Sequence, residues 1–146
     1  MHFTPGLIAA LRDRGVRTAF VTLHIGLDTF APITEENVEA HEIHAEWISV
    51  PEETERAVCE AHARGRRVIA VGTTSVRALE TASGTTGVVA AFEGDTRLYI
   101  TPGYRFRATD AMITNFHLPR STLLVMVSAF AGRERILSAY HEARST

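Results

Sequence analysis

The feature that most constrains the fold is residues 67–80, where an apolar run passes through one glycine into a helix pattern. Residues 68–71 are short, apolar and rich in β-branched side chains, as in a strand buried on both faces. Gly72 permits a tight turn. Three hydroxyl residues that can cap the next helix follow it: Thr73, Thr74 and Ser75. A strand, a turn and a helix in this order indicate an α/β fold.

The same turn is a candidate anion site. The free backbone N–H groups at the start of a helix, at the positive end of its dipole, suit a carboxylate or a phosphate. Arg77, one turn into the helix, can add a bidentate contact to an anion or can be a solvated charge. Many α/β domains use such a turn only to reverse the chain, so both interpretations stay open.

Predicted helices and strands alternate along the chain. Strands are expected at residues 16–23 (central in its sheet), 45–50, 68–71, 97–100 and 111–114. Helices are expected from Thr4-Pro5 to Gly15, from Pro51 to Gly65, from the Gly72 turn to about Thr81, at 123–131 and from Arg133 onward, with a short acidic turn or helix starting at Thr34. This alternation predicts a single three-layer α/β domain over residues 1–146, with a largely parallel or mixed sheet flanked by helices.

Charge and cysteine content narrow the function classes. The net charge of −2 makes no general case for nucleic acid, but residues 97–135 contain six arginines and two acidic residues. An anionic partner can therefore be met locally. A single cysteine excludes a disulfide framework and a cysteine zinc cluster. No apolar stretch approaches the ~20 residues of a membrane span and no signal peptide is seen, so a cytosolic protein is expected.

Two histidine clusters are candidate sites. His41 and His44, three residues apart, could bind zinc together with Glu46 if they lie on a helix. No third ligand at a recognised spacing and no HExxH pattern accompany them, so a polar patch or non-metal pocket is favoured and no metal is predicted. His24, with Asp28 and Thr29 in the loop that follows it, is either a functional or a structural histidine.

The third cluster lies between a predicted strand and a predicted helix. Within eight residues it offers an amide, an imidazole, a guanidinium and two hydroxyls: Asn115, His117, Arg120, Ser121 and Thr122. Pro119 stiffens this segment. It is either a functional site or a helix cap with a solvated arginine beside it.

These residues also carry a resemblance. The chain resembles S-adenosylmethionine:tRNA ribosyltransferase-isomerase, a family of the queuosine pathway of tRNA modification. The similar segments cover nearly all 146 residues: His2-Phe-Thr-Pro, 21–24, 41–46, 68–77, Pro102-Gly-Tyr, 114–124 and 127–132.

The resemblance is to the C-terminal portion of a longer two-domain enzyme. The preceding half, with its inserted β-barrel domain, and an aromatic segment near the family's C-terminus have no counterpart in the sequence. Leu27-Asp28 replace the family's usual Ala-Gly. A separate N-terminal half is therefore an expected partner.

The resemblance implies an unusual reaction. The ribosyl moiety of S-adenosylmethionine moves onto 7-aminomethyl-7-deazaguanine at the wobble position of tRNA and is isomerised to give epoxyqueuosine, while adenine and methionine leave. S-adenosylmethionine is a substrate, and no cofactor is expected. The alternatives are a non-catalytic nucleotide- or tRNA-binding fragment lacking its partner half, and a metal hydrolase using His41 and His44.

The reaction requires a base, a carboxylate anchor and groups that meet tRNA. His24 or His117 are the candidate proton-transfer groups, with Asn115 orienting the substrate. Residues expected to bind S-adenosylmethionine are Gly72, Thr73, Thr74, Ser75, Arg77, Arg120, Ser121 and Thr122. Residues expected to meet tRNA phosphates are Arg105, Arg107 and Arg120.

Overall fold

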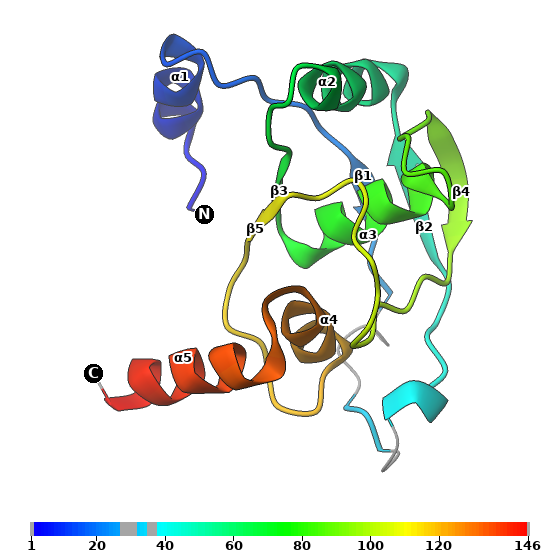
Figure 1. The fold of residues 1–146 in the computed structure, drawn as a ribbon, viewed down its shortest axis with the longest axis vertical. Helices are drawn as coiled ribbons and strands as arrows, with labels where there is room; N and C mark the ends of the chain where they lie inside the picture. Colours follow the sequence, from blue (N-terminus) through cyan, green and yellow to red (C-terminus); the bar gives the residue numbers. More distant parts are fainter. Residues whose placement is uncertain (1, 27–31, 35–37, 146) are drawn as a thin grey trace.

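The computed structural model describes residues 2–26, 32–34 and 38–145 (Figure 1). Its helices are α1 (Pro5–Asp13), α2 (Glu52–Ala63), α3 (Thr73–Ser83), α4 (Thr122–Ala131), α5 (Arg133–Ser145) and the short 3-10 helix η2 (Val38–Ala40). Its strands are β1 (Thr22–His24), β2 (Glu46–Val50), β3 (Ile69–Val71), β4 (Phe92–Thr96) and β5 (Ala111–Ile113).

The strands form two small sheets, with helices around them. The first sheet is antiparallel with the order β1-β2-β4, and the second is a parallel pair of β3 and β5. Helix α3 lies between the two sheets, with α2 on one side and α4 and α5 on the other (Figure 1). The predicted α/β class, with helices flanking sheet, is confirmed. None of the helices described here is long and apolar enough to cross a membrane.

Two strand predictions are wrong in position. The strand expected at 97–100 lies instead at β4, which pairs with β2 from Val50↔Phe92 to Glu46↔Thr96. Ile100 is buried in the core without being in a strand, so its apolar character reflects burial and not sheet pairing. The strand expected at 16–23 shortens to β1 and lies at the edge of its sheet, not at the centre.

The expectation that residues 68–71 are covered on both faces is also wrong. Only Ala70 is buried, whereas its neighbours Ile69 and Val71 point to the exposed face. Strand side chains alternate between faces, so one face of β3 meets the core and the other meets solvent.

Helix starts follow the predicted capping residues in two places out of three. Thr4 Oγ1 accepts from Leu7 N–H at the start of α1, and Ser121 Oγ accepts from Leu124 N–H at the start of α4, both at 3.2 Å. Helix α3 differs, because Gly72 is its N-cap residue and has no side chain to cap with. The hydroxyl cap expected at Thr73, Thr74 or Ser75 is therefore wrong. Ser75 instead donates its hydroxyl to Val71 C=O at 2.8 Å.

Helix α3 is the main contributor to the core. Its Val76 and Leu79 are buried. Buried apolar residues around them come from both sheets and from α2, α4 and the loops: Ile48, Val50, Val58, Ala70, Val89, Ile100, Ala108 and Met126. Because apolar side chains pack on α3 from both sheets, most of the helix has no exposed face.

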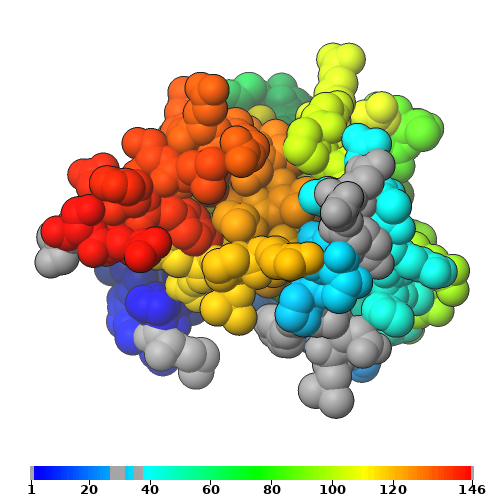
Figure 2. All heavy atoms as spheres, turned by 90° about the horizontal axis from the view of Figure 1, so that it is seen from below, coloured from blue at the N-terminus to red at the C-terminus, as the bar shows by residue number. Residues whose placement is uncertain are grey.

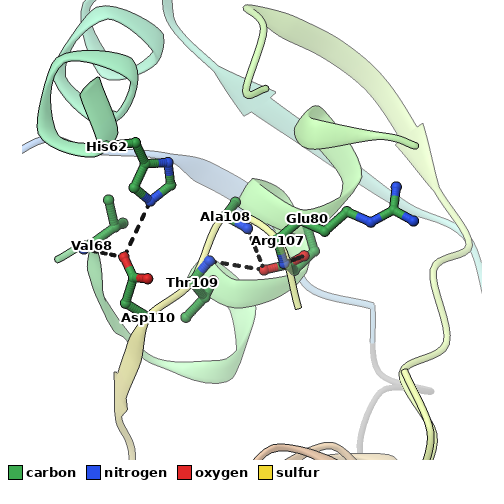
Figure 3. A network of polar contacts seen from close by, with 7 residues as sticks. All are labelled: His62, Val68, Glu80, Arg107, Ala108, Thr109 and Asp110. Atoms are coloured by element: carbon green, nitrogen blue, oxygen red, sulfur yellow. Dashed lines mark hydrogen bonds and ion pairs between the residues drawn. The ribbon is translucent and has the colours of Figure 1, made fainter. Parts of the chain in front are cut away.

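Two carboxylates hold the segment before β5 (Figure 3). Glu80 of α3 is 2% exposed and accepts the backbone N–H groups of Arg107, Ala108 and Thr109 at 2.9 to 3.1 Å. Asp110 accepts Val68 N–H at 2.8 Å and lies 3.2 Å from His62 Nε2. Together they fix a loop that has no regular secondary structure of its own.

Candidate functional site

The parallel pair β3–β5 brings two predicted clusters together. Gly72 N–H, just after β3, donates to Ile113 C=O at the end of β5 with an N···O distance of 2.8 Å. The turn at 72–75 and the loop at 114–117 therefore leave neighbouring strands at the same, carboxyl end. In open α/β folds, ligands bind at the carboxyl end of the parallel strands.

The turn at 72–75 supplies backbone donors. Thr73 is the first helical residue and is buried, and Thr74 and Ser75 are partly exposed. Gly72 adopts φ +91°, a conformation that glycine takes without strain, which allows the abrupt change from strand to helix. The first N–H groups of α3 have no partner within the helix and no side-chain cap, so they suit an anion.

The loop at 114–117 supplies an imidazole in a defined setting. Nε2 of His117 lies 3.1 Å from Thr114 Oγ1. The Tyr140 hydroxyl of α5 accepts His117 N–H and donates to His117 C=O, the latter at 3.0 Å. Burial lowers the pKa of His117 below its ordinary value of 6.5. The ring is thus neutral at pH 7 and can accept a proton. Asn115 lies exposed in the same loop.

Arg77 points away from this turn. Its side chain is 4% exposed and forms an ion pair through Nη1 with Glu46 of β2, whose side chain is 2% exposed. Its Nε and Nη2 atoms have no hydrogen-bond partner among the described residues. The pair links the central strand of the antiparallel sheet to the central helix. Sequence reasoning placed Glu46 in a metal cluster and so missed this role.

Arg120, Ser121 and Thr122 are engaged with the scaffold. Arg120 donates from Nε to Ile33 C=O at 2.9 Å and from Nη2 to Thr34 C=O at 3.2 Å. Its own C=O accepts Ile33 N–H at 2.7 Å. Figure 2 shows the two segments side by side, in gold and light blue. Ser121 caps α4, and Thr122 is the first residue of that helix.

Arg105 and Arg107 lie on the loop that Glu80 holds. Both side chains are exposed, as phosphate contacts require. Arg107 also donates from Nη1 to Gly84 C=O at 3.0 Å, which positions its guanidinium. Phe106 between them packs against Phe130 with ring centroids 4.8 Å apart, so the two arginines flank an anchored residue.

His24 lies on the other sheet. It belongs to β1, and its ring contacts Trp47 of β2 with centroids 4.7 Å apart and an interplanar angle of 41°. His24 is therefore on a different sheet from the strands that lead into the 72–75 turn and the His117 loop. Asp28 and Thr29, grouped with His24 by sequence, lie outside the described residues.

The proposed zinc cluster is not assembled on a helix. His41 and His44 lie in a segment without regular structure between η2 and β2, and His41 contacts the Tyr99 ring at 6.1 Å between centroids. Glu46 is in β2 and pairs with Arg77. Within residues 2–26, 32–34 and 38–145, no three metal-ligating side chains come together.

Comparison with protein families assigns the chain. The family model described as queuosine biosynthesis protein matches residues 1–146. The chain belongs to this family. The membership confirms the family resemblance inferred from the sequence segments.

Individual members of the queuosine biosynthesis family are similar over nearly the whole chain. A relative from Bradyrhizobium sp. strain BTAi1, called S-adenosylmethionine:tRNA ribosyltransferase-isomerase, is 56% identical over an alignment of 146 residues that covers 99% of this chain and 40% of that protein. A Sorangium cellulosum protein of the same name is 57% identical over 145 residues, covering 98% of this chain and 39% of that one. The chain thus spans about 40% of the length of these curated relatives.

A solved structure from the family shares the fold. The crystal structure of S-adenosylmethionine tRNA ribosyltransferase from Thermotoga maritima has a TM-score of 0.78 and 43% sequence identity to this chain. The similarity covers 97% of this chain and 44% of the Thermotoga chain. The α/β arrangement described above is therefore that of the queuosine biosynthesis family.

Two residues that hold the loops of the site in place were not predicted from the sequence. Tyr140 and Glu80 were not singled out, because the loops that they hold are remote in sequence. One signal for Glu80 was available. It lies four residues after Val76 on the buried face of the predicted helix, where a glutamate must have partners.

Proposed function

We propose that this chain carries part of the site that transfers and isomerises the ribosyl moiety of S-adenosylmethionine onto 7-aminomethyl-7-deazaguanine in tRNA, giving epoxyqueuosine with release of adenine and methionine. The observation that supports it is the identity of 56% and 57% to relatives named for this activity. Because the chain spans about 40% of their length, we propose that a further N-terminal portion, supplied as a separate half, completes the enzyme. The cytosol, where tRNA is modified, is the proposed location.

His117 is the proposed base. The reaction requires removal of an acidic C–H next to the sulfonium, and a neutral imidazole can take that proton. The lowered pKa of His117 keeps the ring neutral at pH 7, and Thr114 and Tyr140 hold its orientation. Asn115, in the same loop, would orient the substrate. His24, stacked on Trp47 in the other sheet, is the less favoured candidate.

The turn at 72–75 is the proposed anchor for the methionine carboxylate. Its helix N-terminus offers free N–H groups, and Thr74 and Ser75 are partly exposed beside them. Arg77 is buried, pairs with Glu46 and points away from this turn, so the carboxylate contact expected of it from the sequence is not part of this anchor. Thr74→Val removes a partly exposed hydroxyl beside these N–H groups and should weaken binding of S-adenosylmethionine by about 1.5–3 kcal/mol, the contribution of a hydrogen bond to a charged group. Calorimetry with an unchanged dissociation constant would reject this anchor.

Catalysis is tested by adenine release from S-adenosylmethionine in the presence of tRNA carrying the deazaguanine. The enzyme is a chimera in which this chain replaces the matching residues of the Bradyrhizobium relative. His117→Gln keeps hydrogen bonding but cannot transfer a proton, so turnover should fall by about 10²–10⁴-fold. His141→Gln, an exposed histidine on α5, is the matched control. Near-parental turnover of His117→Gln would assign His117 to the scaffold.

Arg105 and Arg107 are proposed to meet tRNA phosphates. Replacing both by alanine should reduce the slope of log affinity against log salt by about 0.7–0.9 for each phosphate that is no longer neutralised. Arg133 and Arg135, exposed and equally spaced, form the control pair. Equal slopes for the two double variants would remove Arg105 and Arg107 from the RNA interface.

A second candidate function is a non-catalytic tRNA- or nucleotide-binding fragment. The observation that favours it is the coverage of about 40% of the relatives' length. The adenine-release assay separates the two functions, since a binding fragment would retain salt-dependent tRNA affinity while the chimera showed no turnover.

A further inference from the structure

The parallel pair β3–β5 has one bare face. Register pairs Ile69 with Ala111 and Val71 with Ile113, which places these four side chains on the same side. Ile69, Val71 and Ile113 are 47%, 43% and 50% exposed. The opposite side carries Ala70 and Met112, which belong to or pack on the core. We call the face defined by Ile69, Val71 and Ile113 the bare face.

An exposed parallel sheet contradicts the usual behaviour of parallel strands. Parallel sheets occur with both faces covered, because their strands are apolar on both sides. Here only one side is covered by protein. Among the described residues, β3 and β5 pair only with each other, so each also presents an open edge. An apolar face with open edges is a place where further chain packs and pairs.

The occupant of the bare face is inferred from the lengths of the relatives. The relatives match this chain over 98–99% of its residues, but the match covers only 39–40% of their own length. More than half of each relative therefore lies outside the match. The Thermotoga structure likewise has more than half of its chain outside the match. This remaining polypeptide is large enough to cover the bare face.

We propose that the bare face of β3–β5 is the docking surface for the portion of the family's length outside these 146 residues, and that this portion adds a strand to an open edge of the pair. The bare face ends at Gly72 and Ile113, where the 72–75 turn and the 114–117 loop begin. The docked portion therefore borders the candidate site and closes one side of it.

Hydroxyl-radical footprinting tests the docking directly. It compares the oxidation of Ile69, Val71 and Ile113 in this chain with that in the chimera, in which the Bradyrhizobium relative supplies the remaining length. Oxidation of these three residues should fall several-fold in the chimera, while Val88, which is 63% exposed in the loop after α3, should not change. Unchanged oxidation of the bare face would overturn the proposal. Oxidation that falls in the chain alone as its concentration rises would also overturn it, in favour of a second copy.

A substitution provides a second readout that does not depend on activity. Ile113→Asp should lower the melting temperature of the chimera more than that of the isolated chain, because only the chimera buries this position. Val88→Asp is the control and should have equal effects in both. If the chimera does not fold, the remaining portion is co-expressed with this chain, and co-purification should be lost with Ile113→Asp and kept with Val88→Asp. Equal effects of Ile113→Asp in both settings, or co-purification that survives it, would reject the docking surface.

Discussion

The Tyr140 hydroxyl binds both backbone polar groups of His117, accepting its N–H and donating to its C=O. The Tyr140 ring also packs edge-on against Phe116, with centroids 4.8 Å apart. A residue of the last helix thus holds the loop that carries the candidate base. The position of His117 depends on α5 as much as on its own loop.

Tyr140→Phe should loosen this loop. Loss of the hydroxyl leaves two backbone groups without that partner and should reduce the free energy of unfolding by about 1–3 kcal/mol. Greater exposure of the imidazole should raise the pKa of His117 back toward its ordinary value. NMR titration of the histidine ring and urea denaturation measure the two effects. Tyr99→Phe, which removes a hydroxyl bond to Val38 C=O, is the control and should leave the pKa of His117 unchanged.

The same lowered pKa predicts a pH dependence of stability. His117 binds a proton less readily in the folded state than in the unfolded state, where its pKa is about 6.5. Its contribution is therefore fully present above pH ~6.5 and is lost as pH falls through the folded-state pKa. Urea denaturation from pH 7.5 down to 5 should show a fall that is smaller in His117→Gln. An identical pH profile in that variant would contradict the assignment.

Removing one partner of the Glu46–Arg77 ion pair should be strongly destabilising. Arg77→Met removes the guanidinium that pairs with the buried Glu46 carboxylate, and loss of one partner of a buried pair costs about 3–5 kcal/mol. Replacing both residues by apolar ones, as in Glu46→Leu with Arg77→Met, should recover much of that loss. Urea denaturation of the two single variants and the double variant checks this. A double variant as unstable as the sum of the singles would show that the two side chains act independently.

Glu80→Gln should destabilise the fold although it preserves size. The amide group brings two N–H donors to a place where three backbone N–H groups and the Tyr104 hydroxyl already donate. Loss of charge-assisted bonds costs about 1.5–3 kcal/mol each, so a total loss of at least about 2 kcal/mol is expected in urea denaturation. The exposed Glu93→Gln in β4 is the control and should change stability by less than about 0.5 kcal/mol.

Tyr104 should ionise only at strongly alkaline pH. Burial, and then the nearby Glu80 carboxylate, raises the pKa of Tyr104 to about 12. Because this folded-state pKa exceeds the unfolded value of about 10, the associated stability is complete below pH ~10 and is lost as pH rises toward 12. Tyrosinate absorbance should show a late step that disappears in Tyr104→Phe. A titration without that step would contradict the buried setting.

Local sequence patterns predicted individual helices and strands better than they predicted how the strands pair. Thr4 and Ser121 cap α1 and α4 as expected, and the strand before Gly72 and the helix after it are both present. The strand at 92–96 was missed because Phe92-Glu-Gly-Asp-Thr is polar and contains a glycine. Its pairing with β2 is set by a partner more than forty residues away, which no local pattern reports.

The segments of the candidate site could be predicted from the sequence, but their position next to each other could not. The 72–75 turn and the 114–117 loop were each identified from sequence, but only the parallel pairing of β3 and β5 brings them together. Arg77 illustrates the limit. One turn into a helix, an arginine can face an anion or the core, and its direction here follows from Glu46, thirty-one residues earlier in strand β2.

Glu80 fixes the shape of a loop that lies far from it in the sequence. The backbone path of residues 107–109 is specified by one carboxylate on α3 that accepts from three consecutive amides. Ala108 and Thr109 are buried, so Arg107 is the one of the three whose side chain is exposed at the surface. Arg107 can therefore vary under selection for recognition, while proline is barred at all three positions because it has no N–H to donate. A single buried acid thus separates the geometry of this loop from its surface chemistry.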